Sequence, residues 1–474
     1  MLKDLLKEGG LYTVANFLTK GISLLLIPFY TTYFSPDDYG IYDMLIVFGV
    51  FVGNLFSLQL NQGLARYVAE PTSTEKDKIE YASTSFIAFL VLFIVFLIVS
   101  ILFSDLIISK LSPNSLLQKH TFYYALGVIF LNNIFYFLNV YLRFIRKVVL
   151  VSMFSFLHAI FGVLLMIYLV FRKDMGIDSF FVPYLIIVPL LILLQLYNLK
   201  DRLKFRFNIV KFKELTKYSI PLIGGAIAVV VMNLTDRYFI NDMLGENELG
   251  VYGIGVKFSS VIGIVVAGFG TALGPIVFQN HDKSNTQKEL GEMFKLFIAV
   301  GAGGALVFSL YSKELVYTFT NYNYYRATEV LPVMFFTALF AGLLMFSPGL
   351  QVKKKTKVIT FLTIIFALLN FLLNNYFIPI YEMRGAAYST LVSVVLYYSI
   401  YFYLSNKVYP FNYSVIKSSI PFIFSFIVLA LLSNINSDVI FYYKPLIVVV
   451  YVLTVYKLGL LNRILKYDKT STRT

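Results

Sequence analysis

Residues 82–103 of the chain read ASTSFIAFLVLFIVFLIVSILF and contain no charged side chain. An α-helix rises about 1.5 Å per residue, so a run of about 20 apolar residues is long enough to cross the hydrocarbon layer of a bilayer. Hydrocarbon offers the backbone no hydrogen-bonding partner, and a segment that crosses it must therefore be helical. This stretch predicts a transmembrane helix, and with it an integral membrane protein.

Similar apolar runs recur from one end of the chain to the other. Of its 474 residues, 58% are hydrophobic and 14% are charged, whereas soluble proteins carry about 25% charged residues. We predict an all-α, polytopic membrane protein with about 14 transmembrane helices. The predicted spans cover residues 10–34, 41–65, 82–103, 121–142, 148–170, 179–198, 220–243, 251–278, 294–312, 330–352, 358–378, 386–406, 420–436 and 441–461.

The loops between these spans alternate in their content of lysine and arginine. If the N-terminus is cytoplasmic, the cytoplasmic loops carry about 28 such residues and the opposite loops about 8. Cytoplasmic loops of membrane proteins are enriched in positive charge, so we predict that both the N- and the C-terminus are cytoplasmic. The net charge of +14 then reflects topology and attraction to the anionic headgroups of membrane lipids, and not nucleic-acid binding.

The residue types of metal and nucleophilic catalysis are scarce. The chain has no cysteine, which excludes disulfides, thiolate catalysis and cysteine-ligated metals. Its three histidines, His120, His158 and His281, are far apart in the sequence, which disfavours a histidine metal centre. The sequence contains no paired-carboxylate or nucleophile motif. We therefore expect no cofactor, no metal and no enzyme activity.

A short motif occurs twice, before the second and the eighth predicted helix. Residues 34–42 read FSPDDYGIY and residues 244–252 read LGENELGVY, an offset of 210 positions. Each copy is an acidic turn followed by Gly-(Ile/Val)-Tyr, which either chance or an internal duplication explains. A duplication predicts two pseudo-symmetric lobes of about six helices each, related by an axis along the membrane normal. The predicted parts are an N-terminal lobe (1–199), a basic cytoplasmic linker (200–217), a C-terminal lobe (218–410), and helices 13 and 14 with a cytoplasmic tail (411–474).

Several ionisable side chains lie inside or at the ends of the predicted spans, where a charge is costly unless it faces a cavity or a partner. Lys20 lies near the middle of the first span. Two arginines are expected at the cytoplasmic ends and two further cations towards the opposite side, namely Arg66, Arg143, Arg237 and Lys257. Such a row of cations would attract a diphosphate, because arginine offers bidentate donors and lysine a compact charge.

Amide and acidic residues accompany these cations. Asn16 and Asn139, on the first and fourth predicted helices, would hydrogen-bond a sugar, and Asp236 would serve as a charge partner or a coupling group. Alternatively, these side chains join neighbouring helices by hydrogen bonds, as asparagine often does in membrane bundles. The sequence leaves both interpretations open.

Three short stretches and the repeated motif resemble Wzx-type polysaccharide and O-antigen flippases, the oligosaccharide flippase family of the MOP superfamily. These stretches are residues 20–23 (KGIS), 61–67 (NQGLARY) and 235–238 (TDRY). The resemblance implies a MATE/MOP-like fold, with two lobes that alternate between inward- and outward-open states. It also implies basic site residues at Lys20, Arg66 and Arg237.

The implied substrate is an undecaprenyl-diphosphate-linked oligosaccharide, moved from the cytoplasmic to the periplasmic face of the bacterial cytoplasmic (inner) membrane. The product of such transport is used to assemble O-antigen, capsule or exopolysaccharide. The resemblance further implies H+ or Na+ as a coupling ion, and other polysaccharide-assembly proteins as partners.

Two other functions compete with this interpretation. A MATE-like cation-coupled drug exporter predicts buried acids, whereas cations predominate inside the spans of this chain. A polytopic polysaccharide polymerase or ligase would need a large periplasmic loop, and the longest outer loops, near residues 104–120 and 313–329, are short. Both observations favour the flippase.

Overall fold

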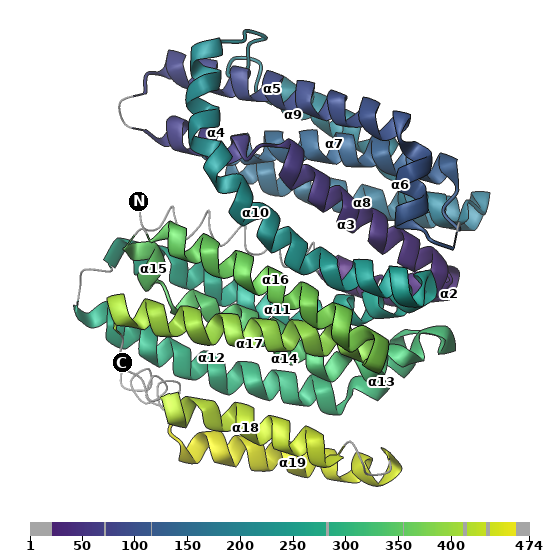
Figure 1. The fold of residues 1–474 in the computed structure, drawn as a ribbon, viewed down its shortest axis with the longest axis vertical. Helices are drawn as coiled ribbons and strands as arrows, with labels where there is room; N and C mark the ends of the chain where they lie inside the picture. The colour runs from purple at the N-terminus through teal and green to yellow at the C-terminus, as the bar shows by residue number, and fades with distance from the viewer. Residues whose placement is uncertain are drawn as a thin grey trace, which may run out of the picture. The chain divides into compact units, whose positions relative to one another are not determined.

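The computed structural model describes residues 21–70, 73–114, 116–280, 284–353, 355–410, 415–432 and 437–460. In these ranges the regular secondary structure is helical and no strand occurs (Figure 1). The prediction of an all-α chain is confirmed.

The described residues separate into two compact units. The first comprises the chain up to Gly253 together with Asn370–Glu382, and the second comprises Ile254–Leu369 with the chain from Met383 onward. The boundary between these two units falls after Gly253. The division into two lobes with a linker at 200–217 stays a prediction.

The described residues of the first unit contain ten helical elements before the boundary. They are α2 (Ile27–Tyr33), α3 (Pro36–Phe56), α4 (Leu60–Ala69), α5 (Glu75–Leu102), α6 (Ser104–Leu111), α7 (Lys119–Phe144), α8 (Val148–Lys173), the 3-10 helix η1 (Gly176–Phe180), α9 (Val182–Asn198) and α10 (Ile209–Leu244). Helix α11 (Glu246–Asn280) begins in the first unit and continues in the second, and α16 (Thr356–Tyr381) likewise belongs in part to each.

The second unit contains the remaining helices. They are α12 (Ser284–Leu310), α13 (Ser312–Phe319), η2 (Tyr322–Glu329), α14 (Leu331–Gly342), η3 (Leu343–Phe346), α15 (Gly349–Val352), α17 (Met383–Val408), α18 (Val415–Leu432) and α19 (Ser437–Lys457).

Among the described residues, 11 helices are long and apolar enough to cross a membrane. Two shorter apolar helices, Gly21–Tyr33 and Ser418–Leu429, accompany them. The structure thus describes a multi-pass membrane protein, while the total of about 14 spans stays a prediction.

The predicted linker 200–217 is helical in its second half. Helix α10 begins at Ile209, and the side chain of Asn208 caps it by accepting hydrogen bonds from the backbone N–H groups of Val210 (3.0 Å) and Lys211 (3.3 Å). An asparagine at the N-cap satisfies donors that have no partner inside the helix. The prediction missed this start because the stretch is charged rather than apolar.

The predicted span 41–65 is not one continuous helix. Helix α3 ends at Phe56 and α4 begins at Leu60, and between them Leu58 (φ 46°) and Gln59 (φ 52°) both adopt the left-handed conformation. That conformation costs a residue with a Cβ about 1–2 kcal/mol. No glycine, asparagine or proline stands at either position, so the sequence carries no signal of the break.

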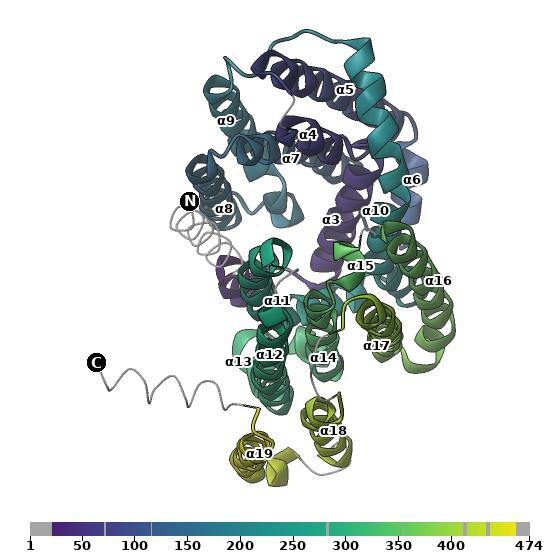
Figure 2. The ribbon, with the colours of Figure 1, turned by 90° about the vertical axis from the view of Figure 1, so that its left-hand side faces the viewer.

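Helix α7 lies in the interior of the first unit. It packs against α3, α4, α5, α8 and α9, and Figure 2 shows it among these helices. Its side chains Phe122, Phe137 and Leu142 are fully buried. A helix apolar on several faces needs partners on all of them, which explains why α7 sits at the centre.

The two copies of the repeated motif pack against each other at the start of α3 and of α11. A Cβ on Gly40 would collide with the carbonyl oxygen of Glu246, and a Cβ on Gly250 would collide with that of Pro36. Only glycine permits the two backbones to approach this closely. Ser35 fixes the start of α3 through a capping box with Asp38.

The side chain of Glu246 anchors the turn between α6 and α7. Its carboxylate is fully buried and accepts hydrogen bonds from the Ser112 hydroxyl (2.7 Å), the Asn114 backbone N–H (3.3 Å) and the Asn114 side-chain amide. Hydrogen bonds to a charged acceptor are stronger than neutral ones. This contact ties the first turn of α11 to the rest of the first unit.

Candidate functional site

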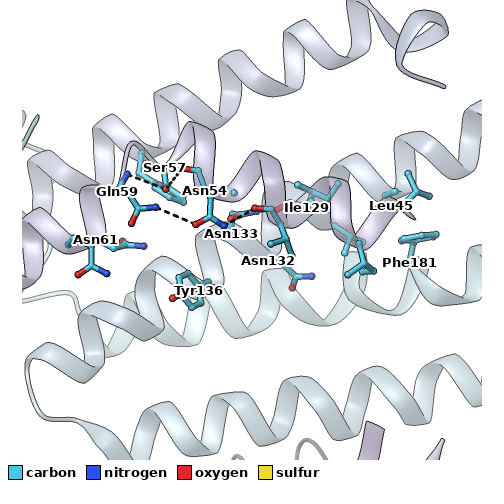
Figure 3. Close-up of a pocket in the computed structure, with 18 residues that line it drawn as sticks. Leu45, Asn54, Ser57, Gln59, Asn61, Ile129, Asn132, Asn133, Tyr136 and Phe181 are labelled. Carbon is cyan, nitrogen blue, oxygen red and sulfur yellow. Dashed lines mark hydrogen bonds between the residues drawn. The ribbon is translucent and has the colours of Figure 1, made fainter. Parts of the chain in front are cut away.

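A cavity of about 460 Å³ lies inside the first unit, a size typical of ligand pockets. Residues of α3, α4 and α7 and of the α3–α4 break form most of its wall, and Figure 3 shows them. Its polar lining consists of Asn54, Ser57, Gln59, Asn61, Gln62, Asn132, Asn133 and Tyr136. Its apolar lining consists of Leu45, Ile46, Gly49, Val50, Gly53, Phe89, Ala125, Val128, Ile129 and Phe181.

The two kinds of side chain occupy different ends of the cavity. Gln59 and Asn61 lie at one end, the amides Asn54, Asn132 and Asn133 lie in the middle near Ile129, and Leu45 and Phe181 lie at the opposite end (Figure 3). The cavity is therefore amphipathic along its length, with its polar end at the α3–α4 break.

The break between α3 and α4 directs amide groups into the cavity. The Gln59 side chain donates a hydrogen bond to Asn54 Oδ1 (3.3 Å), and Asn54 Nδ2 donates in turn to the Val50 carbonyl (2.9 Å). In a continuous helix each residue is rotated by 100° about the axis relative to the one before it. Asn54 and Gln59, five residues apart, would then lie on different faces of the helix and could not form this hydrogen bond. Backbone strain of this kind is often retained where it positions a functional group.

The α7 wall holds its two asparagines in defined orientations. Asn133 Nδ2 donates to the Ile129 carbonyl (2.8 Å), and Gly53 leaves the space that Asn133 Oδ1 occupies, since a Cβ there would lie 2.6 Å from this oxygen. Behind the wall, His158 Nε2 lies 2.9 Å from Asn132 Oδ1. An amide oxygen only accepts, so Nε2 is the donor and His158 fixes the orientation of Asn132.

Among the described residues that line the cavity, none is Asp, Glu, Lys, Arg or His, so this part of the lining is neutral. A side-chain amide offers two N–H donors and an oxygen with two lone pairs, so these groups keep hydrogen-bonding capacity beyond the contacts above. The buried Oδ1 atom of Asn61 has no hydrogen-bond partner in the described part of the chain.

Arg66 lies on α4 one helical turn beyond the lining residue Gln62. Its guanidinium lies over the ring of Tyr218 (4.5 Å to the centroid) and near that of Tyr67 (5.8 Å). The side chain is exposed, and within the ranges that the structure describes it makes no ion pair. Arg66 is thus a cation beside the cavity whose charge no described carboxylate neutralises.

Arg237, by contrast, is engaged by two carboxylates. Its Nε donates to Asp43 Oδ2 (2.7 Å), and its Nη1 lies 3.6 Å from Asp236 Oδ1. Tyr252 donates a hydrogen bond to Asp236 Oδ2 (2.7 Å). The side chains of Arg237, Asp43 and Asp236 are 13%, 16% and 7% exposed, so the cluster is largely shielded from solvent.

Asp43 is the member of this cluster that sequence reasoning missed. It follows the first copy of the repeated motif directly, and a carboxylate in the first turns of a helix has an ordinary explanation in the helix dipole. The only signal was its position one residue after the Gly-Ile-Tyr of the repeat.

The remaining predicted residues lie elsewhere. Asn139 is buried and accepts a hydrogen bond from Gln195 Nε2 (3.1 Å), which joins α7 to α9. Arg143 is exposed at the end of α7, and Lys257 is half-buried on the part of α11 that belongs to the second unit. Lys20 and Asn16 lie outside the described residues.

Many apolar helices and a ligand-sized cavity define the described part of the chain as a multi-pass membrane protein with an internal pocket. The family model described as polysaccharide biosynthesis protein matches residues 5–281, more than half of the chain, and the chain belongs to this family. A second family model, MatE, matches residues 221–376. No curated protein matches the chain.

Solved structures of MOP-superfamily transporters share the fold. The lipid II flippase MurJ, in its inward closed conformation, gives a TM-score of 0.76 at 16% identity over 96% of this chain and 99% of that one. An inward-facing multidrug resistance MATE transporter gives 0.68 at 12% identity over 82% and 94% of the two chains. A MOP transporter from Pyrococcus furiosus gives 0.63 at 13% identity over 85% and 94%. The expected MATE/MOP-like fold is confirmed.

Proposed function

We propose that this protein is a flippase for undecaprenyl-diphosphate-linked oligosaccharide repeat units. It moves them by alternating access from the cytoplasmic to the periplasmic face of the bacterial inner membrane, for assembly of O-antigen, capsule or exopolysaccharide. The observation that carries the proposal is the neutral, amide-lined cavity with Arg66 one helical turn away, in a member of the polysaccharide biosynthesis protein family.

The cavity offers the chemistry that a sugar requires. A sugar hydroxyl donates and accepts hydrogen bonds, and so does a side-chain amide, so each can satisfy the other. Tyr136 is more than half exposed and lines the same cavity, where its ring offers a flat apolar surface to the C–H face of a sugar.

Arg66 offers the chemistry that a diphosphate requires. Its guanidinium presents planar paired donors, which bind phosphate oxygens bidentately. Stacking on Tyr218 orients the guanidinium but does not pair its positive charge with a carboxylate. Residues four apart on a helix lie on one face, so Gln62 and Arg66 can contact adjacent parts of one ligand.

The other residues predicted from the sequence complete the proposed path. We assign Lys20, Arg143, Arg237 and Lys257 to the cationic lining and Asn16 and Asn139 to sugar contacts, with Asp236 as a partner or coupling group for Arg237. The coupling ion is H+ or Na+ in this scheme.

A MATE-like drug exporter is the second candidate, because the MatE model matches residues 221–376. Cationic drugs are bound by carboxylates, and the described residues that line the cavity include none. The neutral cavity beside a cation therefore favours the flippase.

Transport in proteoliposomes tests the proposal. The purified chain is reconstituted with a fluorescent polyprenyl-diphosphate-linked oligosaccharide, and flipping is followed as label in the inner leaflet becomes accessible to a membrane-impermeant quencher. Arg66→Ala should slow flipping about tenfold or more, because a hydrogen bond to a charged group contributes about 1.5–3 kcal/mol.

Arg206→Ala is the matched control. Arg206 is also exposed and also without an ion pair in the described residues, but unlike Arg66 it does not share a helix with residues that line the cavity. This variant should flip at the wild-type rate. Lys20→Ala, expressed at normal levels, should abolish most transport. A wild-type protein that leaves the lipid in place but expels a cationic dye down an imposed ion gradient would overturn the proposal in favour of the exporter.

A further inference from the structure

We infer that the connection between α8 and α9 acts as a gate inside the first unit. This gate segment, residues 174–181, includes η1 and separates the amide-lined cavity from a second cavity, which lies where α3 and α7 begin. A hydrogen-bonded contact with α7 holds the gate segment in place, and its release joins the two cavities. The inference concerns access to the amide-lined cavity and does not depend on which cargo that cavity takes.

The second cavity has a volume of about 330 Å³. Its described lining includes Ile41 of α3, Thr121 of α7 and residues 174–178 of the gate segment. Three aspartates, Asp38, Asp174 and Asp178, belong to this lining, whereas the described lining of the amide-lined cavity contains no carboxylate. The two cavities therefore differ in place and in charge.

The two cavities follow each other along the same pair of helices. On α3, Ile41 lines the second cavity and Leu45 the amide-lined one. On α7, Thr121 lines the second cavity and Ala125 the amide-lined one. Four residues on a helix make about one turn, a rise of about 6 Å. A layer about one helical turn thick therefore separates the two cavities.

The gate segment fills this layer from the third side. Asp178 lines the second cavity and Phe181 the amide-lined one, and Ser179 and Phe180 between them are 0% and 3% exposed. The ring of Phe180 stacks on that of Tyr42 in α3, with 4.1 Å between centroids. Phe181 lies at the apolar end of the amide-lined cavity (Figure 3). Two bulky aromatic side chains thus stand between the cavities.

Asp178 joins the gate segment to α7. Its Oδ1 accepts a hydrogen bond from the Thr121 hydroxyl (2.6 Å), and its Oδ2 lies 2.9 Å from His120 Nε2. An ionised carboxylate only accepts, so Nε2 is a donor here. Among the described residues, these are the only hydrogen bonds from η1 that reach beyond the α8–α9 connection. One side chain therefore carries the polar attachment of the gate segment to α7.

The link from α8 to the gate segment has the conformation of a hinge. Asp174 (φ 48°) and Gly176 (φ 52°) both lie in the left-handed region, and η1 is a 3-10 helix of five residues. Glycine adopts this region freely, and aspartate does so more readily than most residues. Hinges commonly consist of a few loop residues that change their backbone angles. Once the Asp178 hydrogen bonds break, the gate segment can move while α8 and α9 stay in place.

Thiol accessibility tests the inference, because the chain has no cysteine of its own. Single cysteines replace Ala125 and Leu45 in the amide-lined cavity and Gln118 in the second cavity of the full-length chain. Spheroplasts and inside-out vesicles of an expressing bacterium are treated with a membrane-impermeant cationic methanethiosulfonate. Gln118→Cys identifies the preparation in which the reagent reaches the second cavity, and the other cysteines are compared with it there.

Ala125→Cys and Leu45→Cys should react about tenfold or more slowly than Gln118→Cys, because the reagent reaches them only when the gate segment opens. Asp178→Ala should raise both rates about tenfold or more, because it removes two hydrogen bonds to a carboxylate. Thr121→Val removes one of the two and should have a smaller effect in the same direction. Equal rates for the three cysteines, or unchanged rates in Asp178→Ala, would overturn the inference.

Asp105→Ala is the matched control. Asp105 lies on α6 and pairs with Lys119 at the start of α7 (2.9 Å), but it lines neither cavity. Its loss should leave the reaction rates unchanged, and a rise as large as that in Asp178→Ala would also overturn the inference. Thermal unfolding shows whether each variant is folded, and the milder Thr121→Val decides the outcome if Asp178→Ala does not fold.

Discussion

Asp37 and Asn247 occupy equivalent positions in the two copies of the repeated motif, and Asn247 Nδ2 donates a hydrogen bond of 2.9 Å to Asp37 Oδ2. The neighbouring contacts have the same reciprocity. Gly40 is equivalent to Gly250 and Pro36 to Glu246 at the offset of 210 positions, and Gly40 meets Glu246 while Gly250 meets Pro36. Reciprocal contacts between equivalent residues are the mark of a two-fold relationship. The two copies thus form one pseudo-symmetric contact within the first unit.

The close approach of α3 and α11 predicts a high cost for a methyl group at Gly40. We expect Gly40→Ala to destabilise the protein by at least about 1–3 kcal/mol, because the obstructing atom is a backbone oxygen that cannot move aside. Gly224→Ala is the control, since a Cβ there meets nothing within 4 Å and should stabilise α10 by about 0.5–1 kcal/mol. Unfolding by SDS titration measures both, and equal effects would contradict the packing described.

The shielded ion pair predicts that the contributions of Arg237 and Asp43 to the unfolding free energy depend on each other. Arg237→Ala leaves two carboxylates facing each other without their cation, and we expect a loss of about 3–5 kcal/mol in unfolding free energy. In a double-mutant cycle with Asp43→Ala, the two losses should be clearly less than additive.

The exposed pair Lys119–Asp105 provides the control for that cycle. Lys119→Ala should cost no more than about 1 kcal/mol, since surface ion pairs contribute little. Additive losses at Arg237 and Asp43 would show that the two side chains do not interact.

The hydrogen bonds that the Glu246 carboxylate accepts predict that the turn after α6 is protected from hydrogen exchange. Glu246→Ala removes the acceptor of Ser112 and Asn114, while Ser112 itself accepts from the N–H groups of Leu116 and Leu117. We expect a loss of about 1.5–3 kcal/mol in local stability. Hydrogen exchange by mass spectrometry should show faster exchange across this turn, and exchange in the distant helix α8 should not change. Unaltered exchange in the turn would contradict the anchor.

Because Gln59 adopts the left-handed conformation, we predict that the stability of variants at this position depends on how well the new residue tolerates that conformation. Gln59→Val should cost about 1–2 kcal/mol more than Gln62→Val, because a β-branched side chain tolerates the left-handed region poorly and Gln62 is helical. Gln59→Gly should be tolerated in stability but lose the amide that reaches Asn54. If the two valine variants unfold alike, the break does not have this geometry.

Sequence reasoning could relate the position of Arg66 to that of Gln62, because residues at a fixed spacing on one helix point in related directions. Once Gln62 and Arg66 are four residues apart on one helix, their shared face follows without any tertiary information. It did not place Asn139, because any polar residue on a buried helix can face either a cavity or a neighbouring helix, and only packing selects α9 and Gln195. For the same reason, the eight polar residues of the cavity were not recognised as a set.

Run length and composition alone determine that this chain crosses a membrane as helices, since hydrocarbon leaves the backbone no other way to satisfy its hydrogen bonds. The repeat also could be read directly, because it consists of adjacent residues. The partners of charged and amide groups could be decided only by the tertiary structure. Arg237 contacts Asp43 across 194 positions. The amides of α3, α4 and α7 line one cavity beside the α3–α4 break, which no residue type in the sequence indicates. Such contacts depend on which helices pack together, and sequence spacing carries no information about distance between helices.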